Sequence, residues 1–194
     1  MGTPVTPGGA VQDSCVSMSR RALPALGPWR PLANTGPMTQ RVELATVLDR
    51  LAVDELITDY AGAVDDGDWA AYRGLFAPDG RADYRSAGGI EGAAEEVAEW
   101  LSGSMEFFSM RQHLIVNRRV RFGQLEQDEG DTARIRADYV NPMRFADRDG
   151  GEAGVPDFVC GGRYAFELLR THDGWRLRRV TVQEKWRRGP RAGG

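Results

Sequence analysis

The chain has 194 residues, a length that suits one domain with a sizeable hydrophobic core. Hydrophobic residues make up 41% of it and charged residues 27%, which is ordinary for a globular protein. The net charge of −3 gives no overall attraction to nucleic acid or anionic lipid, and no apolar run is long enough to cross a membrane, so we expect neither partner.

The cysteine and histidine content argues against a metal site. The chain contains two cysteines and two histidines, and no Cys/His cluster has the spacing of metal ligands. Cys15 lies in a segment expected to be disordered, so we expect no structural disulfide with Cys160. This usage suits a reduced protein in the cytoplasm.

The chain opens with a segment that has no periodicity. Residues 1–38 are rich in Pro, Gly, Ser and Thr, which predicts a disordered leader. A folded domain is expected over residues 39–187, followed by a flexible tail over residues 188–194. Helical periodicity starts at Thr39, and Asp49 is expected to cap a second helix that ends near Val64. The apolar positions of this second helix recur at helical spacing and form one stripe. They are Val53, Leu56, Ile57, Tyr60, Ala61 and Val64.

An acidic turn follows this helix and begins at Asp65, which lies at the rim of the apolar stripe, about 40° from Ala61 at roughly 100° per residue. Gly67 ends the helix, and Asp68 is expected to cap a short helix that ends near Leu75. Tyr60 and Asp65 therefore place a phenol and a carboxylate at the edge of an apolar interior. Such a pair suits acid–base chemistry, and it equally suits a core tyrosine and a turn aspartate.

Beyond residue 80 the pattern changes from helices to strands. A short strand is expected over Gly80–Tyr84 and a third helix over Ala93–Leu101, and then the apolar residues alternate with period two. Long strands are expected over Gln112–Phe122, Asp131–Phe145, Phe158–Arg170 and Trp175–Trp186. Helices followed by antiparallel strands joined by hairpins predict an α+β fold, with the helices packed on one face of the sheet.

The first long strand is expected to be apolar on both faces. Leu114, Val116, Val120 and Phe122 alternate with a second set that contains His113 and Ile115. If one face lines a cavity beneath the helices, the other face needs cover. We therefore expect a homodimer or homotrimer packed through the outer face of the sheet.

Five motifs, taken in order, resemble the SnoaL-like group of the nuclear-transport-factor-2-like superfamily. They are Tyr60–Asp65 followed by Gly67-Asp68-Trp69, then Phe76–Asp79, Asp83-Tyr84, His113–Asn117, and Gly161–Tyr164 leading to Asp173-Gly174-Trp175. The resemblance covers roughly residues 42–186. It implies a cone-shaped, cystatin-like roll in which N-terminal helices pack on a curled, mostly antiparallel sheet that encloses a pocket.

Within that superfamily the pattern is most similar to scytalone dehydratase and the bacterial bile-acid 7α-dehydratase. The aspartate, tyrosine and histidine motifs of scytalone dehydratase match Asp65, Tyr84 and His113. A tyrosine that precedes the aspartate in the bile-acid enzyme matches Tyr60. The resemblance therefore implies Asp65, His113 and Tyr60 as catalytic residues and Tyr84 as a substrate-binding residue around one cavity.

The chain also departs from that pattern. Scytalone dehydratase has a second catalytic histidine on the strand that corresponds to Asp131–Phe145, and this chain has none there. The polar candidates on that strand are Asp138, which can match an aspartate of the bile-acid enzyme, and Asn141. Substrate-binding positions of the fungal enzyme fall near Arg163, a candidate for binding an anionic substrate group, so the fungal substrate is not implied.

The implied constellation suits proton transfer. An imidazole beside a buried carboxylate acts as a general acid or base near neutral pH, and a phenol can donate to an oxygen on which charge develops. We expect a dehydratase-like lyase or isomerase that acts, without metal or organic cofactor, on a small cyclic hydroxy-ketone of polyketide or steroid type. A polyketide cyclase or epoxide hydrolase, and a non-catalytic ligand-binding or assembly module, remain alternatives. His113 also suits a hydrogen-bonded position in the wall of the sheet.

Overall fold

The computed structural model describes residues 37–146 and 155–189. The predicted leader, apart from residues 37 and 38, and residues 190–194 of the predicted tail lie outside the described residues. Within the described part, helices precede the long antiparallel strands, as the sequence predicts for an α+β fold. No helix in this part is long and apolar enough to cross a membrane.

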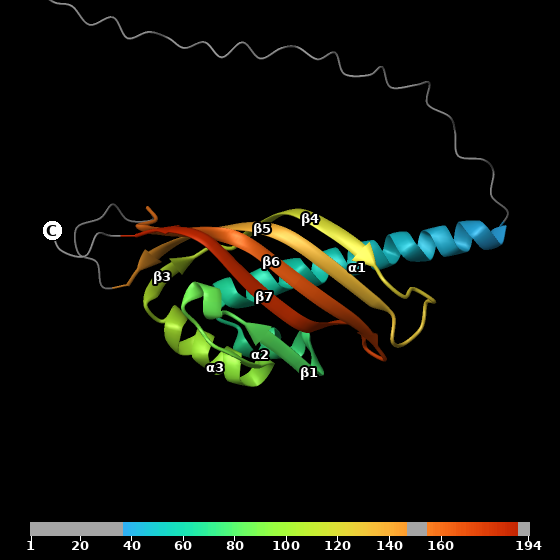
Figure 1. Ribbon diagram of the computed structural model, residues 1–194, viewed down its shortest axis with the longest axis horizontal. Coiled ribbons are helices and arrows are strands. Elements are labelled where there is room, and N and C mark those ends of the chain that lie inside the picture. The colour runs from blue at the N-terminus through green and yellow to red at the C-terminus, as the bar shows by residue number, and fades with distance from the viewer. Residues whose placement is uncertain (1–36, 147–154, 190–194) are drawn as a thin grey trace, which may run out of the picture. The chain divides into compact units, whose positions relative to one another are not determined.

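The strands form one strongly curled sheet, and the helices lie on one side of it (Figure 1). Its order is β2-β1-β7-β6-β5-β3, with β4 also paired to β5. Only β1 and β7 run parallel; the other described pairs are antiparallel. The helices are α1 (Pro37–Asp66), α2 (Trp69–Gly74) and α3 (Ala94–Met105), with a short 3₁₀ turn at Arg85–Ala87. The strands are β1 (Phe76–Asp83), β2 (Glu91–Ala93), β3 (Phe108–Arg111), β4 (Leu114–Phe122), β5 (Thr132–Phe145), β6 (Phe158–Thr171) and β7 (Gly174–Arg188).

Helix α1 is one continuous helix of 30 residues, so the prediction of two helices separated at Asp49 is wrong. Between Pro37 and Gly62 the sequence contains no Pro or Gly that would break the helix. The C-terminal half of α1 crosses the sheet, and its N-terminal half extends past the edge of the sheet (Figure 1). The predicted stripe from Val53 to Val64 is buried, which confirms its place in the core.

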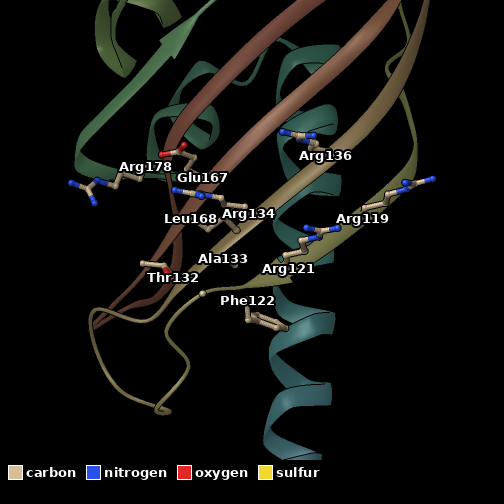
Figure 2. A pocket seen from close by; sticks show the side chains of 11 residues that line it. Arg119, Arg121, Phe122, Thr132, Ala133, Arg134, Arg136, Glu167, Leu168 and Arg178 are labelled. Carbon is tan, nitrogen blue, oxygen red and sulfur yellow. The ribbon is translucent and has the colours of Figure 1, made fainter.

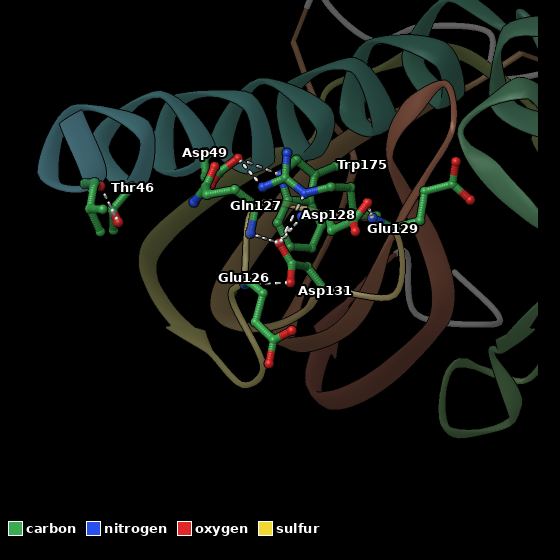
Figure 3. Close-up of polar contacts among 10 residues, drawn as sticks. Thr46, Asp49, Glu126, Gln127, Asp128, Glu129, Asp131 and Trp175 are labelled. Carbon is green, nitrogen blue, oxygen red and sulfur yellow. Dashed lines mark hydrogen bonds and ion pairs between the residues drawn. The ribbon is translucent and has the colours of Figure 1, made fainter. Parts of the chain in front are cut away.

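Asp49 lies in the middle of α1 rather than at a helix cap, and it is only 5% exposed. Its carboxylate accepts hydrogen bonds from Trp175 Nε1 at 3.1 Å, Gln127 Nε2 at 2.8 Å and Arg170 Nη2 at 2.5 Å. Burial alone would raise the pKa of Asp49, but these three donors hold it below its ordinary value. The contacts join α1 to β6, β7 and the β4–β5 turn (Figure 3).

A second buried carboxylate organises the β4–β5 turn. Asp131 is 1% exposed and accepts the backbone N–H groups of Glu126, Gln127 and Asp128 at 2.7, 2.9 and 3.2 Å. Arg170 bridges it to Asp49, because the Arg170 Nε lies 3.2 Å from Asp131. We call Asp49, Gln127, Asp131, Arg170 and Trp175 the anchor network.

The short helix α2 is capped as predicted. The Asp68 side chain accepts the backbone N–H of Ala71 at 2.8 Å, which satisfies a donor that the first turn of a helix leaves free. The strand expected at Gly80–Tyr84 starts earlier, at Phe76. This early part is paired with β7 through Phe76 opposite Leu177, a long-range parallel contact that local periodicity does not reveal.

The two sides of the sheet differ in character, and we call the side facing α1 the inner face and the other side the outer face. On β5 the predicted set Ala133, Ile135, Ala137 and Tyr139 is buried, which confirms the predicted alternation. The same alternation places Asn141 and Met143 on the inner face and Asp138 and Val140 on the outer face.

Strand β4 does not keep a single apolar face, so the predicted grouping of Leu114, Val116, Val120 and Phe122 is wrong. Asn117 has a φ of +53°, and the β4–β5 register shifts by one residue between Val116 and Arg119. This bulge reverses which side chains point inward, because side chains alternate between faces along a strand. Leu114 and Val116 are exposed, whereas Val120 and Phe122 pack against the core.

Candidate active site

Asp65 and His113, 48 residues apart in the chain, are in direct contact. Asp65 lies in the last turn of α1, and His113 lies in the short link between β3 and β4. One carboxylate oxygen of Asp65 is 2.5 Å from His113 Nδ1, and the other accepts the His113 backbone N–H at 2.7 Å. The His113 side chain is only 8% exposed, so the contact is shielded from water.

Arg111 fixes the backbone on both sides of this contact. Its Nε donates to the Asp65 carbonyl oxygen at 3.1 Å, and its Nη1 donates to the Met105 carbonyl oxygen at 3.1 Å. The ends of α1 and α3 each have carbonyls without helical partners, and an arginine satisfies them well. Gly67, with a φ of +70°, turns the chain after α1. The position of Asp65 is therefore determined by the fold and not only by its pairing with His113.

The geometry determines how the imidazole can act. A carboxylate only accepts hydrogen bonds, so a neutral His113 ring beside Asp65 carries its proton on Nδ1. The Nε2 atom then has a free lone pair and can take a proton from a ligand. Asp65 stabilises the positive ring that results, as the aspartate does in other carboxylate–histidine pairs.

Tyr60 and Tyr84 form a second polar pair within the core. Their hydroxyl groups are hydrogen-bonded to each other, although Tyr60 lies on α1 and Tyr84 lies just after β1. Burial raises the pKa of both phenols well above the ordinary value, and neighbouring tyrosines raise them further. Both hydroxyls therefore stay protonated near neutral pH. One donates to the other, so the pair keeps one O–H group that can donate to a ligand.

Asn141 lies beside His113 across the sheet. Leu114 faces Val140 in the antiparallel β4–β5 pairing, so the next positions, His113 and Asn141, face each other on the inner side. Backbone pairing continues past this point, since the Gln112 N–H donates to the Pro142 carbonyl at 3.2 Å. Asn141 is 4% exposed, and its side-chain oxygen has no hydrogen-bond partner among the described residues. An unpaired buried acceptor is costly, and it offers a place for a ligand hydroxyl.

Aromatic rings connect Asn141 to the tyrosine pair. Burial raises the pKa of Tyr164 well above its ordinary value, whereas a hydrogen-bonding interaction with Asn141 acts in the opposite direction. The centroid of the Tyr164 ring lies 5.8 Å from that of the Tyr60 ring, in an edge-to-face arrangement. Asp65, His113, Asn141, Tyr60 and Tyr84 thus belong to one region on the inner face. We call these five residues the inner site.

Asp138 and Arg163 do not belong to this region. They face each other across β5 and β6 on the outer face, and Arg163 Nη2 lies 2.7 Å from Asp138 Oδ1. Hydrogen bonds from Arg163, with a further one from Asn117, hold the pKa of Asp138 below its ordinary value. The structure thus brings five of the seven predicted site residues together and places these two on the opposite side of the sheet.

Two residues near the inner site were not predicted from the sequence. Arg111 precedes the Gln112-His113 motif by one position, but nothing in the sequence indicates that it caps two helices. Tyr164 ends the Gly161–Tyr164 motif, but its place opposite Ala137 depends on the β5–β6 register, which the sequence does not reveal. Among the described residues, no group of three or more His, Cys, Asp or Glu side chains could hold a metal ion.

The family of the chain follows from comparison with known proteins. The model of the SnoaL-like domain family matches residues 45–181, which run from within α1 to within β7. The chain belongs to the SnoaL-like domain family, within the nuclear-transport-factor-2-like superfamily. An uncharacterized protein of Mycobacterium tuberculosis is 36% identical over 143 residues, which cover 73% of this chain and 90% of that protein.

Solved structures show the same fold. A protein from Novosphingobium aromaticivorans named as a candidate aromatic ring hydroxylase is 27% identical, with a TM-score of 0.60 over 72% of this chain and 91% of that one. A candidate scytalone dehydratase from the same organism is 15% identical, with a TM-score of 0.61 over 77% of this chain and 92% of that one. At 15% identity, the second likeness concerns the fold alone.

Proposed function

We propose that the chain is a cofactor-independent lyase or isomerase that removes a proton from the carbon beside the carbonyl of a small cyclic hydroxy-ketone. The observation that carries this proposal is the contact of both Asp65 oxygens with His113, at 2.5 and 2.7 Å. This contact leaves the ring Nε2 as the proton acceptor. The presence of a candidate scytalone dehydratase on the same fold is consistent with this class of reaction.

In the proposed dehydration, His113 Nε2 takes the proton from the carbon next to the carbonyl. The electron pair of the broken C–H bond moves into an enolate, whose oxygen accepts a hydrogen bond from the Tyr60–Tyr84 pair. The enolate then expels the β-hydroxyl group, and the protonated His113 returns its proton to that group, so that water leaves. The products are water and an unsaturated ketone, and the imidazole is regenerated.

The inner site supports this route without a second histidine. Asn141, and not Asp138, is the polar residue of β5 that faces His113. Its unpaired oxygen can accept a hydrogen bond from the substrate hydroxyl and so orient the leaving group. One imidazole would therefore serve as base and then as acid, a role for which a carboxylate-paired histidine is suited.

The test compares three variants on a panel of cyclic β-hydroxy-ketones, following the absorbance of the unsaturated product. His113→Ala is expected to lower kcat/KM by about 10²–10⁴-fold, the usual contribution of a positioned acid or base. Asp65→Asn keeps the shape of the side chain but not its charge, and its kcat/KM is expected to lie between those of His113→Ala and the wild type. His172→Ala is the matched control, because His172 is exposed in the β6–β7 hairpin, and it should stay within about twofold of the wild type.

Equal rates for His113→Ala and the wild type on any compound that is turned over would refute the proposed role. Product analysis separates the alternatives on the same fold, since a polyketide cyclase would form a ring and an epoxide hydrolase would yield a diol. The non-catalytic alternative also has a specific observation behind it. Tyr60, Tyr164 and Phe166 are almost fully buried, and the centroids of their rings lie 5.3 to 5.8 Å apart. A wild type that neither binds nor turns over any hydroxy-ketone would favour an assembly module, and one that binds them without turnover would favour a ligand-binding module.

We also propose that the chain forms a homodimer or homotrimer through the outer face and works in the cytoplasm. Large apolar side chains are exposed in one cross-strand row, with Leu114 opposite Val140 and Val140 opposite Gly161. The Trp186 ring lies over Gly161 in the same row, and Trp186 is 48% exposed. These residues supply an apolar contact surface on the outer face, although the bulge at Asn117 turns Val120 and Phe122 toward the core.

A further inference from the structure

The outer face carries a cluster of arginines at the end away from the apolar row. Arg119 and Arg121 lie on β4, and they face Arg136 and Arg134, respectively, on β5. All four residues are exposed, and Figure 2 shows their side chains on the side of the sheet away from α1. We call these four residues the outer-face arginine cluster.

None of the four side chains has a hydrogen-bond or ion-pair partner among the described residues. This contrasts with Arg163 and Arg179 nearby, which pair with Asp138 and Glu91 at 2.7 and 2.8 Å. Like charges directly opposite each other destabilise a sheet, and here two such pairs are adjacent. The chain as a whole has a net charge of −3, so the positive charge of the cluster reflects placement and not composition.

The cluster lines a cavity of about 600 Å³. A neighbouring cavity of about 440 Å³ shares Arg119 and Arg136 with it. Volumes of this size are typical of small-molecule sites. Glu167 is the only acidic residue among those that line the larger cavity, so the lining has an excess of positive charge.

We propose that the outer-face arginine cluster binds a small molecule that carries two or more phosphate groups. Guanidinium groups bind phosphate through paired N–H donors, which makes arginine the residue best suited to this ligand. The two Arg–Arg pairs are two residues apart along their strands, about 7 Å, a distance that two linked phosphate groups can span. The site is independent of the inner site, because β4 and β5 separate the two.

The surroundings of the cluster favour a small ligand over a nucleic acid strand. Binding of single strands uses a long positive groove with exposed aromatic rings on which bases stack. Here the ion pair of Arg163 with Asp138 bounds the cluster on one side and Glu167 bounds it on the other. The aromatic residue in the cavity lining is Phe122, whose ring packs near Trp175 and is covered by Arg50.

The test titrates the full chain with inorganic triphosphate in a calorimeter at low and at moderate salt. We expect saturable binding that weakens with salt, and at least a tenfold loss of affinity in the Arg121→Gln/Arg134→Gln double variant. The matched control is Arg41→Gln/Arg188→Gln, which removes the same charge from exposed positions outside the cluster and should bind within about twofold of the wild type. The single Arg121→Gln variant serves the same purpose if the double variant does not fold, with a smaller loss expected.

Four results would overturn the proposal. The first is no triphosphate binding by the wild type, which is also the result expected if a second copy of the chain covers the cluster. The second is equal binding by the cluster variant, and the third is an equal loss in the control pair, which would indicate overall charge. The fourth is a single-stranded oligonucleotide that binds more tightly than triphosphate and depends on the same arginines.

Discussion

Replacing Asp49 with asparagine tests the anchor network most directly. The substitution keeps the size of the side chain but removes the charge, and one amide oxygen cannot satisfy Arg170, Gln127 and Trp175, which now donate at 2.5 to 3.1 Å. Hydrogen bonds to a charged group contribute about 1.5–3 kcal/mol each, and an unpaired buried donor costs about 1–3 kcal/mol. Arg170 keeps its contact with Asp131, so we expect a net loss of about 2–4 kcal/mol, or roughly 4–16 °C in Tm for a domain of this size.

The effect has a defined dependence on pH. Because the folded pKa of Asp49 lies below its ordinary value, the unfolded chain takes up the proton first as the pH falls. The stability from Asp49 is therefore fully present above the unfolded pKa of about 4 and is lost as the pH falls through the folded pKa. The difference between wild type and Asp49→Asn should be largest near pH 7 and should shrink below about pH 4.

Urea unfolding followed by circular dichroism between pH 3 and 7 provides the measurement. Asp59→Asn is the control, since Asp59 lies exposed on the same helix and its loss should change stability by less than about 0.5 kcal/mol. An Asp49→Asn variant as stable as the wild type at pH 7 would show that the charge of Asp49 does not stabilise the anchor network. So would a stability difference that grows as the pH falls.

The remaining predictions concern two glycines, the β4 bulge and the oligomeric state. Urea unfolding measures the changes in stability, and light scattering measures the oligomeric state. Gly162→Ala should lower the free energy of unfolding by more than about 2 kcal/mol, because a Cβ there would lie 2.1 Å from the Gln183 carbonyl oxygen. Gly62→Ala has open space around it in α1 and should raise the free energy of unfolding by about 0.5–1 kcal/mol. Asn117→Val should cost about 1–2 kcal/mol, since its φ of +53° disfavours a branched side chain, and equal stability would argue against the bulge. Light scattering at micromolar concentration should show a dimer or trimer that Val140→Glu dissociates and Val42→Glu does not; a wild-type monomer would end the oligomer proposal.

Much of the fold could be predicted because its signals are local. The apolar stripe from Val53 to Val64, the Asp68 cap and the alternation along β5 depend on neighbours within a few residues, and the structure confirms each of them. Asp49 was misjudged because an aspartate between apolar positions resembles a cap. Its real partners lie 78 to 126 residues further along the chain, where no local pattern can reveal them.

Only part of the inner site could be predicted from the sequence. The resemblance placed Asp65, His113, Tyr60 and Tyr84 around one centre, but it could not choose between Asp138 and Asn141. That choice depends on the register of β5 against β4 and on which face each residue occupies. Similarly, the bulge at Asn117 changes which side chains of β4 point outward, and the residue types alone do not indicate it. The outer-face arginine cluster can therefore be predicted only once the β4–β5 register is known.

The pairing of Asp65 with His113 can be measured without any substrate. Long-range ¹⁵N NMR spectra report which ring nitrogen carries the proton, and with only two histidines in the chain the signals can be assigned from His172→Ala. We predict that neutral His113 carries its proton on Nδ1, with Nε2 unprotonated, and that Asp65→Asn shifts this preference. A neutral His113 protonated on Nε2 in the wild type, unchanged by Asp65→Asn, would show that Asp65 does not set the tautomer and that Nε2 is not the proton acceptor.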